Sequence, residues 1–386
     1  MFAIDIQDQI LDKLNTLIVV LNNNGSIEYV SKSAQQLLGY NSDDLLGNAW
    51  WEVTRFSKPE GELVKRNIIS SIKNKTIESQ IFEHELKTFG GGKKWVRWNI
   101  STLNETQLIG VGYDITDNKL NEKKLLESNK LLTEQNKNVT DSIYYAQRIQ
   151  QSFLQSEDQL KKIFSESFLL YKPKDIVSGD YYWFYETELY KFIAVVDCTG
   201  HGVPGAMMSM VANSLFKEVF VNRKLQDTSE ILYALDEELA KSINKNDDAN
   251  FNDGMDVSLI RINKQTLELS FSGAFRSVVI VRDNEISELK GSRYPIGFYS
   301  GVQKNFETIT HSLQPNDCLY LFSDGFIDQF GGEQNKKLNK TNFKELLQTI
   351  NDMPMNEQDS FLEYAFNNWK QDTIQTDDVL VVGVRV

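Results

Sequence analysis

The sequence predicts an α+β protein of several domains, and three features of the chain point to it. Its 386 residues exceed the roughly 100–200 residues of one ordinary domain. Apolar runs of strand length alternate with turns and helical patterns over residues 1–117 and again over residues 158–386. Residues 118–157, between these two regions, contain neither glycine nor proline. With 41% hydrophobic residues, the chain can bury a substantial core.

Charge and composition exclude several classes of protein. Lys and Arg number 41 and Asp and Glu number 54, a net charge of −13, which disfavours a nucleic-acid binder and a polybasic membrane anchor. Two cysteines, Cys198 and Cys318, make neither a disulfide framework nor a zinc cluster. With only three histidines, a metal site would consist mainly of carboxylates, which favour Mg or Mn. No signal peptide or apolar run of membrane-spanning length is evident, so we expect a cytoplasmic protein.

Residues 1–117 contain the pattern of a compact α/β unit. The apolar run 17–21, the turn NNNG and the run 26–30 predict a β-hairpin. Helical patterns follow at 33–38 and 42–46, and the segments FEHELKTF, GGGKKWVRWNISTL and TQLIGVGYDIT predict three more strands.

Residues 1–117 resemble a PAS sensor domain in the order and spacing of four segments. These segments are the hairpin, NSDDLLGNAWWEV, GGKKWVRWNIS and GYDITDNK. The resemblance implies a ligand cavity under the sheet, but the sequence leaves the PAS ligand unknown. The region has no cysteine, which disfavours a flavin-adduct photosensor. Its one histidine, His84, fits a solvated strand position better than a haem ligand.

Residues 118–157 predict one long helix with a heptad repeat. The apolar positions recur every seven residues, at Leu125, Leu132, Val139, Ala146 and Phe153. The companion positions are mostly polar, which weakens the seam and helps to fix its register. We expect a parallel coiled-coil homodimer; the alternative is a monomeric helix that packs on a neighbouring domain.

Residues 158–386 combine many strand-like runs with helical stretches at 204–221 and 229–243, which predicts a layered α+β fold. The strand-like runs are KFIAVVD, DVSLIRIN, LELSFSGA, SVVIVRD, CLYLFSD and DVLVVGVRV. Neither a phosphate-binding P-loop nor a dinucleotide-binding glycine motif occurs.

Aspartates lie at the ends of several of these runs. Asp180 follows a glycine in SGDYYWF, Asp197 ends the run AVVD, Asp324 follows LYLFS, and Asp377 and Asp378 precede the last run. Any one of these residues also fits a simple turn cap. Because buried carboxylates are costly unless paired or bound to metal, several together predict a cage for hard divalent cations.

The residues around these aspartates are similar to the SpoIIE-type branch of the PPM superfamily of metal-dependent serine/threonine phosphatases. The matching segments are VSGDYYW, VVDCTGHGVPGAMMS, NDGMDVSLI, FSGAFR, YPIG, LFSDGFIDQFGG and TDDVLVV. The resemblance implies a two-sheet β-sandwich flanked by helices, with two Mn²⁺ or Mg²⁺ ions at one edge. It also implies hydrolysis of a phosphoserine or phosphothreonine on a regulatory protein, commonly a STAS-type anti-sigma-factor antagonist, by a metal-activated water.

By the same resemblance, Asp197 bridges the two ions and Asp180 contacts one of them directly or through water. The backbone carbonyl of Cys198 is a further ligand, and Asp324 and Asp377 complete the second site. This set makes the four aspartates the expected catalytic residues.

Other residues near these motifs have less certain roles. Asp378 is adjacent to Asp377, but neighbouring residues of a strand point to opposite faces. We therefore expect Asp378 to support the metal ligands rather than to contact a metal ion. Gly200 and Gly202 allow the backbone to come close to metal or substrate, and they fit an ordinary turn equally well. Asp256, in NDGMD, is either a turn residue or a contributor to the metal site.

The sequence departs from the eukaryotic members of the superfamily at the expected general acid. Thr199 stands where those members have a histidine, and His201 does not align with that position. Solvent or a metal-bound water is then the expected proton donor, and His201, which is near the site in sequence, is the alternative. The phosphate-binding arginine has no evident counterpart, since Lys172 and Lys174 fit surface positions.

Two other function classes remain in view. A PPM-fold binding module without activity would keep the fold, but the complete set of aspartates argues against it. A PAS-linked histidine kinase would share the sensor and the helix, but the helix contains no histidine and no kinase ATP lid is evident.

Overall fold

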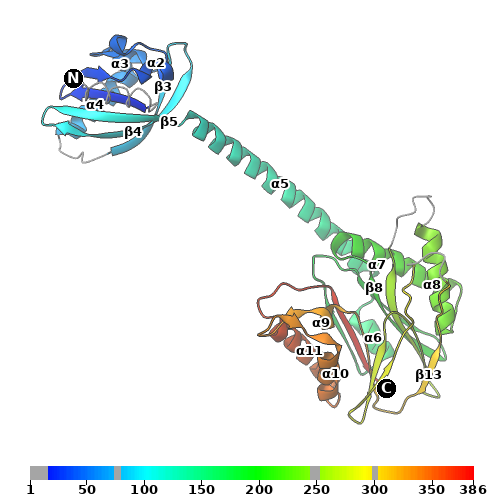
Figure 1. Cartoon of the computed structure of the whole chain (residues 1–386). Coiled ribbons are helices and arrows are strands. Elements are labelled where there is room, and N and C mark those ends of the chain that lie inside the picture. The colour runs from blue at the N-terminus through cyan, green and yellow to red at the C-terminus, as the bar shows by residue number, and fades with distance from the viewer. Residues whose placement is uncertain (1–15, 74–79, 244–252, 298–302) are drawn as a thin grey trace. The chain divides into compact units, whose positions relative to one another are not determined.

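The computed structural model describes residues 16–73, 80–243, 253–297 and 303–386 (Figure 1). The chain forms two compact units, Met1–Asn136 and Lys137–Val386. The fold class expected from the sequence, an α+β chain with a PAS-like unit and a two-sheet unit, is confirmed. Among the residues described, no helix is both long enough and apolar enough to cross a membrane.

The N-terminal unit is a five-stranded antiparallel sheet in the order β2-β1-β5-β4-β3. Its strands are β1 (Thr16–Asn22), β2 (Ile27–Val30), β3 (Gln80–Lys87), β4 (Lys93–Asn104) and β5 (Gln107–Asp114). The helices between β2 and β3 are α2 (Ser33–Leu38), η1 (Ser42–Leu45), α3 (Ala49–Val53) and α4 (Lys58–Lys73). The predicted hairpin is present as β1 and β2, and the three later strands are β3, β4 and β5.

The core of this unit lies on one face of the sheet. Side chains of β1 and β4, such as Val19 and Trp98, pack with Leu38 and Trp50 from the helices. Alternate residues of β4 are buried, as the two-residue period of a strand requires. The sheet and the helices therefore enclose the space in which a PAS ligand is expected.

The helix predicted over residues 118–157 is α5 (Thr116–Phe153), which begins directly after the last strand of the sheet. Its seam residues Leu125, Leu132 and Val139 are 62%, 55% and 59% exposed. A short helix, α6 (Glu157–Ile163), follows and begins with a capping box of Ser156 and Gln159.

The C-terminal unit contains two five-stranded antiparallel sheets, in the orders β13-β10-β9-β8-β7 and β12-β11-β14-β17-β6. The first sheet consists of β7 (Asp180–Glu186), β8 (Tyr190–Cys198), β9 (Met255–Asn263), β10 (Glu268–Ala274) and β13 (Ile309–Ser312). The second consists of β6 (Ser167–Lys172), β11 (Val278–Arg282), β12 (Glu285–Leu289), β14 (Cys318–Phe322) and β17 (Val379–Arg385). A small ribbon pairs β15 (Phe330–Gly331) with β16 (Lys336–Lys337).

The two sheets pack face to face, and helices cover their outer faces. In β7, Tyr182 and Phe184 point into the apolar layer between the sheets, whereas Tyr181 and Trp183 pack against helices. The first sheet is covered by α7 (Gly202–Lys217), the π-helical turn η2 (Glu218–Asn222) and α8 (Thr228–Ile243). The second is covered by α10 (Asn339–Ile350) and α11 (Met355–Lys370), which lie apart from α7 and α8 in Figure 1.

The two predicted helical stretches correspond to α7 with η2 and to α8. The sequence analysis identified neither α10 nor α11, although both carry an apolar face. They complete the outer layer over the second sheet of a four-layer sandwich.

Candidate functional site

Three aspartates form one row across the first sheet. Asp180 on β7 pairs with Asp197 on β8, which pairs in turn with Asp256 on β9. Residues directly opposite each other on antiparallel strands point to the same face, so these three carboxyl groups share one side of the sheet. The register brings Asp256 into the site, which the sequence motif alone did not establish.

The second sheet contributes acids from two adjacent strand ends. Asp324 follows β14 and precedes the short helix α9 (Gly325–Asp328), and Asp377 and Asp378 precede β17. The two segments are in close contact, because a Cβ atom added to Gly325 would lie 1.8 Å from the carbonyl oxygen of Asp378. Glycine is therefore required where the two acidic loops meet.

Ser323 connects the two sheets. Its hydroxyl donates to Oδ2 of Asp180 at 2.6 Å and accepts the backbone N–H of Leu380 at 3.0 Å. Asp180 is 2% exposed. Burial, followed by the nearby charge of Asp197, raises the pKa of Asp180 well above its usual range.

Asp378 has a supporting position, in line with the sequence expectation. Its Oδ1 accepts the backbone N–H of Lys174 and its Oδ2 accepts that of Gly179, each at 2.8 Å. Both oxygens thus hold the loop that leads to Asp180. The oxygen Oδ1 of Asp377 accepts the N–H of Asp378 at 2.9 Å.

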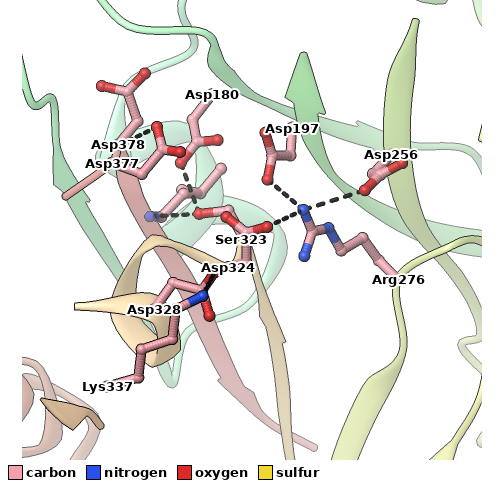
Figure 2. Close-up of polar contacts among 11 residues, drawn as sticks. Asp180, Asp197, Asp256, Arg276, Ser323, Asp324, Asp328, Lys337, Asp377 and Asp378 are labelled. Carbon is pink, nitrogen blue, oxygen red and sulfur yellow. Dashed lines mark hydrogen bonds and ion pairs between the residues drawn. The ribbon is translucent and has the colours of Figure 1, made fainter. Parts of the chain in front are cut away.

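Arg276 occupies the point on which three of the acids converge (Figure 2). Its Nη2 lies 2.6 Å from Asp197, 2.8 Å from Asp324 and 3.1 Å from Asp256. The side chain is only 14% exposed, and its Nε has no hydrogen-bond partner within the described part of the chain. Burial lowers the pKa of Arg276, but the three carboxylates raise it further, so the guanidinium stays charged.

Two of the acids around Arg276, Asp197 and Asp256, have a raised pKa. Burial raises the pKa of Asp197, and the attraction of Arg276 offsets only part of this effect. Burial also raises the pKa of Asp256 to about 6. A group of carboxylates that resists ionisation in this way is stabilised by added positive charge.

The turn after β8 contains the remaining sequence candidates. Gly200 and Gly202 have φ of +83° and +62°, which explains the choice of glycine at both positions. The thiol of Cys198 is buried, and burial raises its pKa well above the ordinary value, which argues against a nucleophilic thiolate. The backbone carbonyl of Cys198, not its thiol, is the group for which the sequence predicts a role as a metal ligand.

Thr199 and His201 have partners of their own. The hydroxyl of Thr199 lies 3.2 Å from Oδ1 of Asp253 and accepts the N–H of Gly254 at 3.1 Å, which fixes the turn before β9. His201 Nδ1 lies 3.0 Å from Oδ2 of Asp175, and both side chains are about half exposed. These contacts explain the presence of the Thr199 and His201 side chains without a role in catalysis.

A cavity of ≈ 260 Å³ adjoins the acidic row. It is lined by Asp197, Thr199, Met255, Asp256, Phe275, Arg293 and Pro295. Phe275 is 61% exposed and has a φ of +65°, a left-handed conformation that is costly for an aromatic residue. The cavity thus places an exposed aromatic ring and a cationic side chain beside the carboxylates.

The donor chemistry of the site fits hard divalent cations. The converging groups are carboxylates, as Mg²⁺ and Mn²⁺ prefer, and Arg276 is a positive charge that stands among them. With the guanidinium there, no three His, Cys, Asp or Glu side chains of the described residues form a ready-made cation site. In this structure, Nη2 of Arg276 occupies the position between Asp197 and Asp324.

Sequence reasoning missed Arg276 and Ser323. Both follow strands of the C-terminal unit, and the motifs FSGAFR and LFSDGF contain them. An arginine two residues after a strand end is the available signal, but two of its three carboxylate partners lie 48 and 79 residues away in sequence.

Comparisons with known proteins agree with this geometry. A family model for Stage II sporulation protein E (SpoIIE) matches residues 190–386, and a PAS-domain model matches residues 15–117. The chain belongs to the SpoIIE family of PP2C-type serine/threonine phosphatases and carries an N-terminal PAS domain. Phosphatases of this family are metal-dependent.

Among solved structures, the SiaA-PP2C domain of Pseudomonas aeruginosa is 31% identical, with a TM-score of 0.60, over 65% of this chain and 98% of that chain. The PP2C phosphatase domain of SpoIIE from Bacillus subtilis, with a regulatory fragment, is 20% identical with a TM-score of 0.47, covering 57% and 62%. The RsbU and RsbW domains of a Mycobacterium tuberculosis protein are 17% identical with a TM-score of 0.46, covering 57% and 59%. No curated protein sequence matches the chain significantly.

Proposed function

We propose that this chain is an active, signal-regulated protein phosphatase that hydrolyses a phosphoserine or phosphothreonine on a regulatory protein. The observation that carries the proposal is the convergence of acids from both sheets, Asp180, Asp197, Asp324 and Asp377, at one edge of the sandwich. Family membership supports the reaction class. The remaining region, residues 118–157, would transmit a signal from the PAS region, residues 1–117, to the phosphatase region, residues 158–386.

The phosphatase region would hold two Mn²⁺ or Mg²⁺ ions. Their ligands would be Asp180, Asp197, Asp324, Asp377 and the carbonyl of Cys198. Bound ions of this kind supply positive charge opposite a phosphate dianion and an activated water for its hydrolysis. Ser323 would orient Asp180 through their 2.6 Å hydrogen bond, and Asp378 would hold the loop before it. These contacts explain how the chain keeps a buried carboxylate in place.

Arg276 would bind the phosphoryl group of the substrate. Its guanidinium has hydrogen-bond donors in a planar fork that suits a phosphate, and it lies beside the carboxylates in the folded chain. Phe275 and Arg293, in the adjoining cavity, would contact the residues around the phosphorylated side chain. A STAS-type anti-sigma-factor antagonist is the substrate class that the family resemblance favours.

Hydrolysis of p-nitrophenyl phosphate by the full chain, with Mn²⁺ added and then removed by EDTA, tests the reaction. We expect activity that requires the metal and returns when Mn²⁺ is supplied in excess. A phosphorylated STAS protein and a phosphotyrosine peptide, compared at equal concentration, then test the substrate class. Faster release of phosphate from the tyrosine peptide would contradict the serine/threonine assignment.

A second candidate is a binding module without activity, and Arg276 is the observation that favours it. A guanidinium bound to Asp197 and Asp324 neutralises these acids without a metal. In that case, Mn²⁺ would neither bind nor change the thermal stability of the chain. Calorimetric titration with Mn²⁺ separates the two candidates before any substrate is chosen.

We also propose that α5 forms a parallel coiled-coil homodimer. The apolar seam on α5 is largely exposed within one chain, and a second copy would bury it. Light scattering of the full chain and of Leu132→Asp tests this. We expect a dimer that the charged substitution dissociates, whereas a monomeric wild-type chain would contradict the proposal.

The C-terminal end of α5 supports a link between the helix and the site. The side chain of Gln150 donates to the carbonyl of Ser178 at 2.6 Å and accepts the N–H of Ser178 at 3.2 Å. It also donates to the hydroxyl of Ser209 on α7 at 2.9 Å. Since Ser178 lies two residues before Asp180, a rotation of the helix would disturb the position of this carboxylate.

A further inference from the structure

A second cavity lies beside the one that adjoins the acidic row. The cavity next to the acids has a volume of ≈ 260 Å³, and the second one has a volume of ≈ 310 Å³. Arg293 lines both of them, so the two cavities adjoin. The wall of the second cavity includes two cations, Lys290 and Arg293, and one acid, Glu307. A protein segment bound at the acidic row therefore has room to continue along a wall that carries cations.

The backbone between the two cations is fixed to β10 and lies against Arg276. The N–H of Ser292 donates to the carbonyl of Gly273 at 2.7 Å, and the carbonyl of Ser292 accepts the N–H of Phe275 at 3.0 Å. A Cβ atom added to Gly291 would lie 2.2 Å from the carbonyl oxygen of Arg276. This segment therefore packs directly on the residue that is proposed to bind the phosphoryl group.

Lys290 and Arg293 are cations without partners in an acidic protein. Both side chains are exposed, and within the described part of the chain neither forms an ion pair or a hydrogen bond. The chain has 54 acidic and 41 basic residues, so acids for pairing are plentiful. Other arginines of the C-terminal unit do form ion pairs, namely Arg223, Arg276, Arg282 and Arg385. The two open cations are therefore available to an acidic group of another molecule.

Glu307 reduces the positive charge of this wall without cancelling it. Its Oε1 accepts a hydrogen bond from Nδ2 of Asn305 at 2.7 Å. Two cations and one acid leave the wall with one net positive charge. Such a wall attracts a carboxylate and disfavours a lysine or an arginine.

We propose that Lys290 and Arg293 bind an acidic side chain of the phosphorylated protein, close to its phosphoserine or phosphothreonine. This inference rests on the proposed phosphatase function and specifies its substrate. Arg276 would hold the phosphoryl group, while the carboxylate would lie in the second cavity. There, the planar guanidinium of Arg293 suits a carboxylate, and Lys290 adds a compact charge. The substrate class is then a phosphoprotein with glutamate or aspartate near the phosphorylated residue.

Hydrolysis of three phosphoserine peptides by the full chain with Mn²⁺ tests this preference. The peptides are equal in length and differ only in the residues that flank the phosphoserine, which are glutamate, glutamine or lysine. We expect kcat/KM to be about three- to tenfold higher for the glutamate peptide than for the glutamine peptide, because exposed ion pairs are individually weak. The lysine peptide should be the poorest substrate. The preference should shrink in about 0.5 M NaCl, since salt screens exposed charges.

Variants of the two cations test the assignment. In the double variant Lys290→Gln with Arg293→Gln, the glutamate and glutamine peptides should become about equal substrates. Reversal of both charges, by Lys290→Glu with Arg293→Glu, should make the lysine peptide the better substrate. A damaged fold would lower all rates but would not invert the preference. The control Lys162→Gln changes an exposed lysine on α6 and should keep the wild-type ratio.

Two results would overturn the acidic subsite. One is equal kcat/KM of the wild-type chain for the glutamate and glutamine peptides, and the other is an unchanged preference in the charge-reversed variant. If no peptide is hydrolysed, inhibition of p-nitrophenyl phosphate hydrolysis by each peptide gives the same comparison. A wild-type chain that hydrolyses p-nitrophenyl phosphate without any preference among the peptides contradicts this subsite alone. Absence of Mn²⁺-dependent hydrolysis of every substrate contradicts the phosphatase function itself, and the subsite with it.

Discussion

Asp197 is the residue on which the proposed metal centre depends most. We expect Asp197→Asn to lower turnover at least ~100-fold and to remove most Mn²⁺ binding, because metal ions supply several kcal/mol of transition-state stabilisation. Circular dichroism should remain that of the wild-type chain. Asp372→Asn, at an exposed position, is the matched control. Near-normal turnover of Asp197→Asn at limiting Mn²⁺ would show that the site is assigned to the wrong residues.

Arg276 should compete with metal in the free protein. In Arg276→Gln, the internal cation is gone from Asp197 and Asp324, so we expect Mn²⁺ to bind several-fold more tightly. Turnover should nevertheless fall ~10- to 100-fold, since one charged contact to the phosphate is lost. Calorimetry and steady-state kinetics measure the two effects separately.

Arg293→Gln provides the comparison for this prediction. Arg293 lines the neighbouring cavity, so its loss should raise KM for a phosphoprotein without tightening Mn²⁺ binding. If Arg276→Gln leaves the Mn²⁺ affinity unchanged, Arg276 does not compete for the metal.

Glu288 on β12 gives a prediction for acid stability. Burial alone raises its pKa, but hydrogen bonds from Lys340, Lys344 and Ser277 outweigh this effect and hold the pKa at about 2. Because the folded-state value lies below the ordinary value of 4.5, the stabilisation is present above pH 4.5 and is lost as the pH falls toward 2.

We therefore expect Glu288→Gln to lower the free energy of unfolding at pH 7 by about 1–2 kcal/mol, after allowance for solvent screening. The difference from the wild-type chain should shrink as the pH falls below 4.5. Denaturant unfolding across this range measures it, with the exposed Glu285→Gln on the same strand as control. A difference that is constant with pH would mean that the ion pairs do not stabilise the fold.

At the residue scale, the sequence predicted the acids better than their partners. Asp197 and Asp324 stand beside strand ends, where local pattern alone identifies them. Asp256 joins the row only through the β8–β9 register, and Arg276 meets Asp324 only when the two sheets come together. Contacts between distant segments leave no periodic signal in the sequence, so these two roles required the fold.

In helix α5, the rotational position of the heptad seam relative to Gln150 should matter most for regulation. The last turns of α5 hold Ser178 through Gln150, and the seam repeats every seven residues. Insertion of three or four residues after Lys137 should change basal phosphatase activity, because it rotates the seam relative to Gln150. Insertion of seven residues should restore it, since a full heptad returns the same face. Equal activities for all three insertions would mean that the helix is only a spacer.

At the scale of elements, long periodic segments and apolar runs were predicted, whereas less apolar helices were not. The core strands β8, β9, β14 and β17 all fall on runs identified in the sequence. The helices α10 and α11 bury residues such as Phe343 and Phe366 among many polar ones. Their buried residues are spaced three or four apart, which is the pattern of an amphipathic helix, so periodicity predicts both helices although no continuous apolar run marks them.

At the scale of the whole molecule, the division of the chain differs from the boundaries suggested by composition. Composition separates residues 118–157 from the phosphatase region because they lack glycine and proline. The compact C-terminal unit begins at Lys137 and therefore contains the last turns of α5. Composition reflects the helical character of this segment, whereas its contacts decide with which unit it folds.

The last turns of α5 and the two residues that follow them should be necessary for the stability of the phosphatase unit. Gln155 donates to the carbonyl of Phe184 at 2.8 Å and accepts its N–H at 2.6 Å, while Leu154 packs against two apolar clusters of the unit. Together with Gln150, these contacts hold β7, the strand that carries Asp180. A chain that begins at residue 160 loses all of them, but one that begins at residue 145 keeps them.

We expect the shorter chain to be less stable by about 6–8 kcal/mol, from roughly 1 kcal/mol for each of the five side-chain hydrogen bonds of Gln150 and Gln155 and about 1.5–3 kcal/mol for the burial of one leucine side chain. Its Mn²⁺ affinity should also fall, because the loop before Asp180 loses its support from Gln150. Denaturant unfolding and calorimetry of the two shortened chains measure both quantities. Gln150→Ala in the longer one should weaken Mn²⁺ binding with a smaller loss of stability. Equal Mn²⁺ affinities of all three proteins would mean that α5 contributes to the fold alone and that a signal from the PAS domain reaches the site by another route.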